Sequence, residues 1–233
     1  MFKLIYYVGG GVMSTAKEYV MRNLVKVWTD FEMQLDNVPV IKKINRGKFR
    51  LEDYKLWLLN HRQQVIEGGR WIALAGSNID NEFADLRSNF IKHAATEHLD
   101  YKMLEKNYVS IGGKQEDIEC YPKNLGTEIL SSYMFHQAGK PNPFHLLGAM
   151  FIIEGLGQKK ATEWGHTIKE QLHLKAEQVS FLLYHGENDE HHMQEFDAAL
   201  SLILAKDDDL KEEIIKTAQI VAKLYIIQLE EIR

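Results

Sequence analysis

Apolar residues recur at intervals of three and four along most of the chain, a period typical of amphipathic helices. The first such run starts after Ser14 or Thr15, either of which can cap a helix, and it continues to about Leu35. Strand-like alternation never extends beyond a few residues, and no internal repeat or low-complexity block is visible. The pattern therefore predicts an all-α protein.

About seven helices are expected, separated by glycine, proline and polar segments. We place them at about residues 14–35, from 51 past 71, 81–111, 127–137, 143–164, 175–205 and 210–229. The sixth is expected to bend at Gly186. Residues 41–47 are interpreted as a short linker, and residues 114–126 as a polar connection. Short connections favour antiparallel neighbours, so we predict a single-domain antiparallel bundle.

The bundle domain is expected to span residues 13–233, with residues 1–12 as a flexible N-terminal extension or a misplaced start before Met13. The apolar part of this extension, residues 2–8, is too short to cross a bilayer. It also lacks a convincing signal-peptide cleavage site. We therefore expect a soluble protein without a membrane partner.

The net charge and the single cysteine limit the classes of function that the protein can have. The net charge is -5, the pI is about 6.1, and no basic run is interleaved with aromatic residues. These features argue against a protein that binds nucleic acid. The single cysteine, Cys120, cannot form an internal disulfide, which fits a reducing cytoplasm. We interpret it as an inert thiol near the surface.

Histidines and acids form three rows with the same spacing. Residues four and seven apart share one face of a helix, so the pattern His-x3-acid-x2-(acid or His) aligns three potential metal ligands. The rows are His93, Glu97 and Asp100; His185, Asp189 and His192; and His166, Glu170 and His173. The alternative interpretation of each row is a solvated helix face or an exposed turn.

Glu154 is the natural further ligand, because it lies in an otherwise apolar stretch where an unpaired carboxylate is unfavourable. A buried carboxylate bonded to a tyrosine or tryptophan is the alternative. On a straight helix His166 would lie about 18 Å beyond Glu154, so we interpret the His166 row as a surface feature. Glu67 precedes two glycines and either faces the same cavity or is a surface acid.

Imidazole and carboxylate ligands without a thiolate favour iron, manganese or zinc, and open positions in such a site favour Fe(II) and oxygen. The predicted metal ligands are His93, Glu97, Asp100, Glu154, His185, Asp189 and His192. Carboxylates can bridge two ions, so one or two iron ions are expected.

Three stretches carry a resemblance to a known superfamily. They are residues 37–58 from Asn37-Val38-Pro39 to Trp57-Leu58, the segment Phe151-Ile152-Ile153-Glu154-Gly155, and the row His185-x3-Asp189-x2-His192. In these stretches the chain resembles the haem-oxygenase-like superfamily of TenA, PqqC and the haem-oxygenase-like di-iron oxidases. The third stretch is similar to the ligand row on a late helix of the di-iron oxidases.

The sequence also differs from members of this superfamily at positions that would bind the metal, the haem or the substrate. The di-iron oxidases have a glutamate and a histidine on their third helix, whereas here His93 and Asp100 occupy positions seven apart with the types reversed. Haem oxygenases take a proximal histidine from their first helix, and this chain has none before His61, so no haem is expected. The TenA thiaminases use a cysteine that faces the pocket, and Cys120 falls instead in the polar connection.

Together these features predict a non-haem iron oxidase or oxygenase that uses O2 on a small organic substrate in the bundle core. Trp57, Trp71, Tyr133 and Phe135 are candidates to line its cavity, although core packing is the alternative role for each. A metal-free enzyme of the TenA or PqqC kind, using Glu154 for acid/base chemistry, and a small-molecule-binding regulatory protein remain as alternatives. The resemblance further implies a homodimer.

Overall fold

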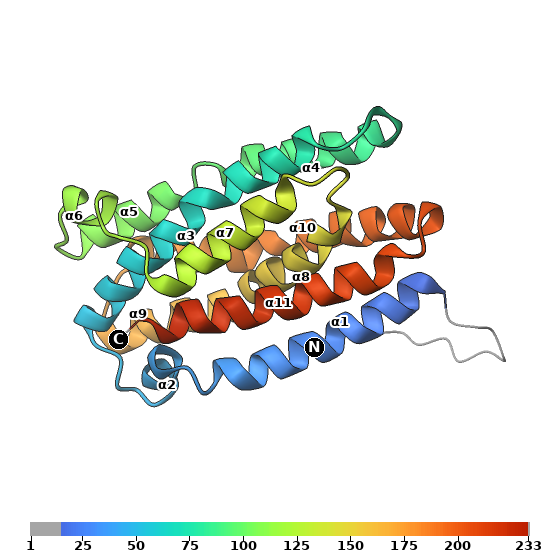
Figure 1. Ribbon diagram of the computed structural model, residues 1–233. Coiled ribbons are helices and arrows are strands. Elements are labelled where there is room, and N and C mark those ends of the chain that lie inside the picture. Colours follow the sequence, from blue (N-terminus) through green and yellow to red (C-terminus); the bar gives the residue numbers. More distant parts are fainter. Residues whose placement is uncertain (1–14, 233) are drawn as a thin grey trace.

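The computed structural model describes residues 15–232, apart from the side chains of residues 187–194. This part of the chain is an all-α bundle without strands, as the apolar periodicity predicts. The long helices α1, α3, α7, α10 and α11 lie roughly side by side along one axis (Figure 1). The predicted N-terminal extension, residues 1–12, lies outside the described residues.

The first half of the chain follows the predicted helices with three corrections, the first being that the expected polar connection over 114–126 contains a short helix. The helices are α1 (Ala16–Leu35), α2 (Pro39–Asn45), α3 (Leu51–Ser77), η1 (Asn81–Phe83), α4 (Ala84–Glu97), α5 (Tyr101–Ser110) and α6 (Gln115–Glu119). The expected linker at 41–47 is wrong, because Pro39 starts a short helix there. The expected single helix over 81–111 is also wrong, because a turn at residues 98–100 divides it.

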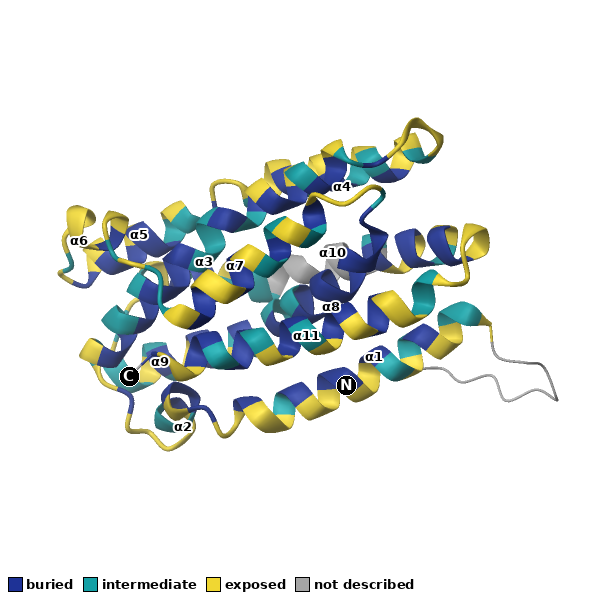
Figure 2. Ribbon diagram, in the orientation of Figure 1, coloured by how far each residue is buried: buried dark blue, intermediate teal, exposed yellow. Residues whose placement is uncertain are grey.

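The second half begins with α7 and encloses α8. Its elements are α7 (Leu125–Ala138), η2 (Phe144–Leu146), α8 (Leu147–Leu156), the π-helical segment η3 (Gly157–Ala161), α9 (Thr162–Leu172), η4 (Ala176–Val179), α10 (Ser180–Lys206) and α11 (Leu210–Glu230). The backbone of α10 continues as a helix through Gly186, where a bend was expected. Almost every residue of α8 is buried, and Figure 2 shows it in dark blue behind α11.

Two contact surfaces hold the bundle together. Helix α3 packs on α4, α5 and α7, and α11 packs on α1, α7 and α8. Helix α10 closes the remaining side against α8, η3 and α9. Because α8 lies inside this shell, a polar side chain on α8 must find its partners within the protein.

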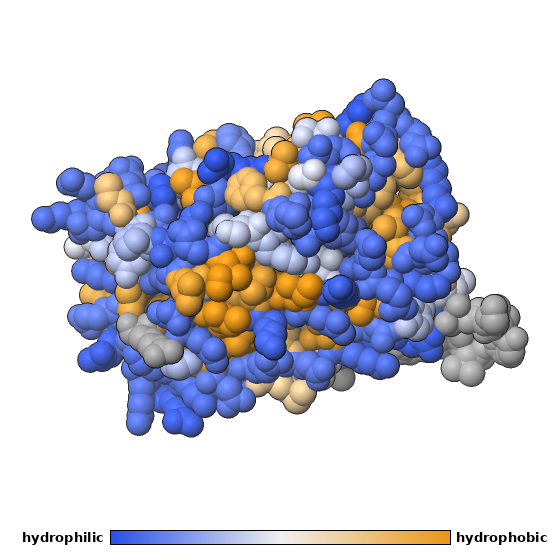
Figure 3. Space-filling model, in the orientation of Figure 1, coloured by the Kyte–Doolittle hydropathy of each residue, from blue (hydrophilic) through white to orange (hydrophobic). Residues whose placement is uncertain are grey.

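Apolar side chains are gathered on the outer surface over α7 and α11 (Figure 3). Two apolar residues of α7, Leu125 and Ile129, are exposed. Exposed apolar surface of this kind is typical of protein–protein contacts, and the expected homodimer stays a prediction. Within the described residues, no helix has an apolar stretch long enough to cross a bilayer.

The close approach of α8 to α11 depends on Gly148. A Cβ atom at this position would collide with the carbonyl oxygen of Ile214 and would lie 2.8 Å from the backbone nitrogen of Ala218. Backbone atoms of α11 cannot move aside as a flexible side chain can, so only glycine allows this helix spacing.

We expect Gly148→Ala to lower the free energy of unfolding by about 1–3 kcal/mol, because the added methyl group overpacks the contact between α8 and α11. Gly68→Ala is the matched control, since a Cβ at Gly68 on α3 meets no atom within 4 Å. The control should be neutral or stabilising by up to about 1 kcal/mol. Urea unfolding measures both, and equal effects of the two substitutions would contradict the packing argument.

Candidate metal centre

Glu97 and Asp100 lie at the turn between α4 and α5. Glu97 ends α4, and the Asp100 backbone nitrogen donates to the Glu97 carbonyl oxygen at 3.2 Å. This turn lies directly on α3, because a Cβ atom at Gly69 would be 2.6 Å from the Cα atom of His98. Glycine at position 69 therefore lets the turn approach the bundle core. His98 itself is exposed.

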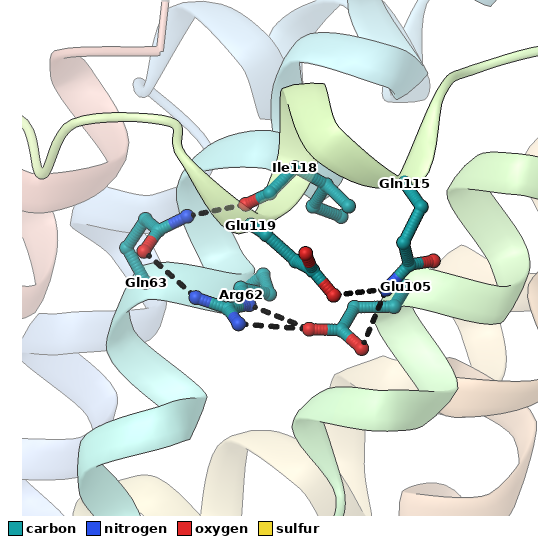
Figure 4. Close-up of polar contacts among 6 residues, drawn as sticks. All are labelled: Arg62, Gln63, Glu105, Gln115, Ile118 and Glu119. Atoms are coloured by element: carbon teal, nitrogen blue, oxygen red, sulfur yellow. Dashed lines mark hydrogen bonds and ion pairs between the residues drawn. The ribbon is translucent and has the colours of Figure 1, made fainter.

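A buried ion-pair network fixes α5 behind this turn (Figure 4). The Arg62 guanidinium donates from Nε and Nη2 to Glu105 Oε1 at 3.0 and 2.8 Å, and it lies over the Tyr101 ring. The neighbouring Gln63 amide donates to the Ile118 carbonyl oxygen at 2.8 Å. Removing one partner of such a buried pair is strongly destabilising. The network therefore holds α3, α5 and α6 in one arrangement beside Asp100.

Glu154 reaches the same region from α8. Its Oε1 atom lies 3.1 Å from His93 Nε2, and His93 Nε2 lies 4.0 Å from Glu97 Oε1. Gly155 lets α8 pack against Trp28, since a Cβ there would be 2.9 Å from the indole ring. The π-helical segment η3 follows directly, and such segments are frequent near functional sites.

His185 completes the cluster from α10. Its Nε2 atom lies 3.3 Å from Asp100 Oδ2, and its ring packs on Phe181 with centroids 4.3 Å apart. The next residue, Gly186, allows α10 to contact α9, because a Cβ there would collide with the Thr162 hydroxyl. Backbone contact at Gly186 thus brings the imidazole to the carboxylates.

Glu97, Asp100 and His185 form a possible metal site. Each offers one ligand atom, and these three atoms lie within 4.8 Å of one another. Their side chains are only 17%, 12% and 12% exposed. A carboxylate pair and an imidazole in this arrangement match the ligand types of iron, manganese and zinc.

The cluster raises the pKa of Glu97 to about 7. Burial is the largest cause, the charge of Glu154 is the second, and Asp100 adds to both. His185 and His93 act in the opposite direction without offsetting the rise. Crowded, desolvated carboxylates favour either a proton or a bound cation. The electrostatics of this cluster therefore fit a metal ion.

A cavity of about 120 Å³ adjoins the cluster, and Glu97, Glu154 and His185 form part of its wall. Of the four aromatic candidates, Trp57 and Trp71 line this cavity, whereas Tyr133 and Phe135 are not among its lining residues. Glu67 also lines it. Both Glu67 oxygens form ion pairs at 2.7 Å, to Arg70 and Lys123.

The structure brings five of the seven predicted ligands together, namely His93, Glu97, Asp100, Glu154 and His185. Asp189 and His192 lie outside the described side chains, so their role stays a prediction. The third row is on the surface, since His166, Glu170 and His173 are all exposed. Cys120 is exposed and is not a lining residue of the cavity.

His61, Gln64 and Tyr225 also line the cavity, and none of them was predicted as a site residue. Burial lowers the pKa of His61 to about 3, with a smaller effect from the charge of His185. Burial raises the pKa of Tyr225 to about 12. Only one feature of the sequence pointed to His61, and it was weak. His61 is polar but occupies a position of α3 at which the periodic pattern places an apolar residue.

A family profile described as iron-containing redox enzyme, of the haem oxygenase-like type, matches residues 57–226. The chain belongs to this family. No curated protein matches the chain.

Solved structures share the fold. A domain of unknown function with a haem oxygenase-like fold from Shewanella denitrificans is 20% identical, with a TM-score of 0.84 over 95% of this chain and 93% of that chain. A TenA homologue from Pseudomonas syringae pv. tomato is 12% identical, with a TM-score of 0.73 over 97% and 98%. A TenA homologue from P. horikoshii is 14% identical, with a TM-score of 0.67 over 94% and 98%.

The raised pKa of Glu97 predicts a pH-dependent effect of Glu97→Gln in the metal-free protein. In the unfolded chain the Glu97 carboxyl ionises near pH 4.3, and in the folded protein it ionises near pH 7. The protonated Glu97 carboxyl therefore contributes to the free energy of unfolding at low pH, and this contribution is lost as the pH rises through 7. Glutamine does not ionise and lacks this loss.

The quantity to compare is the melting temperature of Glu97→Gln minus that of the parent protein. We expect this difference to be more positive at pH 8 than at pH 5 by about 5 °C. Thermal unfolding in the presence of a chelator measures it at both pH values. A difference that is the same at the two pH values would show that burial does not disfavour the ionised Glu97 carboxylate.

Proposed function

We propose that the protein is a non-haem iron oxidase or oxygenase that acts on a small organic molecule in the bundle core. The observation that carries the proposal is the convergence of Glu97, Asp100 and His185 on one point beside a cavity. Mixed imidazole and carboxylate sites with open positions favour Fe(II) and O2. The description of the family as iron-containing redox enzyme supports the same choice.

The proposed ligands come from three directions. Glu97 and Asp100 come from the turn between α4 and α5, Glu154 from α8 and His185 from α10, with His93 beside Glu154. Asp189 and His192 follow His185 by four and seven residues, a spacing that places helical residues on one face. These residues would hold one or two ions, and manganese or zinc are the alternatives to iron.

Iron bound at this site would supply the electrons that O2 activation requires. The chain's own residues confine the substrate. Trp57, Trp71 and Trp164 give the cavity large apolar walls that exclude water next to the cluster. The buried Tyr225 hydroxyl keeps its proton at neutral pH, because burial raises its pKa to about 12. It therefore offers a neutral hydrogen-bonding group close to Glu154.

A metal-free enzyme that uses Glu154 and a tyrosine for acid/base chemistry is the second candidate. Glu154 and Tyr225 both line the cavity, and the charge of Glu154 contributes to the raised pKa of Tyr225. An acid/base pair of this kind is suited to proton transfer. Activity that survives chelation would favour this candidate. Activity that is lost with a chelator and restored by Fe(II) would favour the iron oxidase.

Metal content after anaerobic loading with Fe(II) tests the proposal. We expect roughly one to two iron ions per chain and consumption of O2 on exposure to air. Glu154→Ala and His185→Ala should each lower the iron affinity by at least about tenfold, because each removes a ligand. Less than about one-tenth of an equivalent of iron in the parent protein would reject the proposal.

The exposed row supplies matched controls. Glu170→Ala and His166→Ala remove the same side-chain types from a helix face that points to solvent. Both should leave the iron content and O2 consumption unchanged. If they reduced iron binding as much as Glu154→Ala and His185→Ala, the ion would be bound elsewhere.

A further inference from the structure

One face of α3 forms a wall of the cavity. Its lining residues follow one another at helical spacing, namely Trp57, His61, Gln64, Val65, Glu67, Gly68, Trp71 and Ile72. Glu67 already forms ion pairs with Arg70 and Lys123. The apolar members need no partner other than a hydrophobic ligand. His61 and Gln64 differ, because each presents polar atoms to the same enclosed space.

Two polar atoms of this face are buried without a partner. Within the part of the chain that the structure describes, neither His61 Nδ1 nor Gln64 Oε1 has a hydrogen-bond partner. His61 is 8% exposed, and it is therefore more than nine-tenths buried. Unpaired buried polar atoms are destabilising and call for an explanation such as a ligand.

Both side chains are held in place by their neighbours. The His61 ring stacks on Trp57 with centroids 4.6 Å apart and meets the edge of Phe181 at 5.3 Å. The Gln64 amide lies near Tyr225 and partly offsets the rise in the pKa of the Tyr225 hydroxyl that burial causes. Gln64 Oε1 has no hydrogen-bond partner among the described residues, so this oxygen is available as an acceptor for a ligand.

The charge of the cavity wall limits what can bind. Among the described residues that line it, the acids are Glu67, Glu97 and Glu154, and none is lysine or arginine. Burial lowers the pKa of His61, so its ring is uncharged at neutral pH and supplies no cation. In the metal-free protein an anionic ligand would lose its hydration without gaining a cationic partner in this cavity.

We propose that His61 and Gln64 form the recognition site of the cavity and take a small uncharged aromatic compound bearing a hydroxyl or N–H group. One hydroxyl can donate to Gln64 Oε1 and accept from the protonated nitrogen of the His61 ring. The volume of about 120 Å³ suits a single ring, since an apolar cavity of about 150 Å³ holds benzene in another protein. That this compound is the substrate rests on the proposed function, whereas the binding site itself does not.

Phenol is the probe, with toluene as its apolar counterpart and benzoate as its anionic counterpart. Binding to the full-length metal-free protein is followed by tryptophan fluorescence, since three indoles line the cavity. We expect phenol to bind at least about tenfold more tightly than toluene or benzoate. Equal affinities, or a preference for benzoate, would overturn the proposal.

Two nearly isosteric variants locate the site. His61→Phe and Gln64→Met should each weaken phenol binding by about tenfold and leave toluene binding unchanged. His166→Phe, at an exposed position, should bind all three probes as the parent protein does. Variants that keep the preference for phenol would show that these two residues do not recognise it.

The ligand-free stability separates recognition from a structural role. His61→Phe removes a buried unpaired atom and keeps a ring against Trp57, so its melting temperature should equal or exceed that of the parent protein. A marked fall would assign His61 a structural role and overturn the proposal.

Iron content measured after the same preparations are loaded anaerobically with Fe(II) distinguishes the two claims. If the protein prefers phenol but binds no iron, the recognition site is supported and the proposed function is rejected. If it binds iron but does not prefer phenol, the proposed function is supported and the recognition site is rejected.

Discussion

Three carboxylates share a buried space with two imidazoles, and this constraint governs the rest of the structure. Glu97, Asp100 and Glu154 lie where α4, α5, α8 and α10 meet, facing His93 and His185. Buried like charges repel unless a proton or a cation is present. Burial and, after it, the repulsion from Glu154 raise the pKa of Glu97 to about 7. A metal ion held by Glu97, Asp100 and His185 would offset this repulsion, which is why we propose a metal centre and not a purely structural network.

The backbone is arranged so that these side chains can meet. Gly69 brings the turn after α4 onto α3, Gly155 brings α8 onto Trp28, and Gly186 brings α10 onto α9. A β-carbon would meet backbone atoms of the facing element at Gly69 and Gly186, and the Trp28 ring at Gly155. The buried pair of Arg62 with Glu105 then fixes α5 next to the turn. Rigid helices with glycine contacts thus position ligands that come from distant parts of the chain.

The sequence predicts the fold and the position of the cluster, because both depend on local spacing. Glu154 stands out as a charge in an apolar helix, and His93 and Glu97 are four residues apart on one face. The turn between Glu97 and Asp100 could not be predicted, since their spacing also fits an unbroken helix and only the contact with α3 at Gly69 decides. His61 was missed for a related reason: its position on α3 is known from the sequence, but the cavity in front of it is a product of tertiary packing.

Anomalous X-ray scattering at the iron absorption edge, from crystals of the Fe(II)-loaded protein, tests the central claim most directly. The account predicts an iron peak within bonding distance of carboxylate oxygens of Glu97, Asp100 and Glu154 and of a ring nitrogen of His185. An iron peak elsewhere, or a fully iron-free cluster in protein that carries iron by chemical analysis, would contradict it.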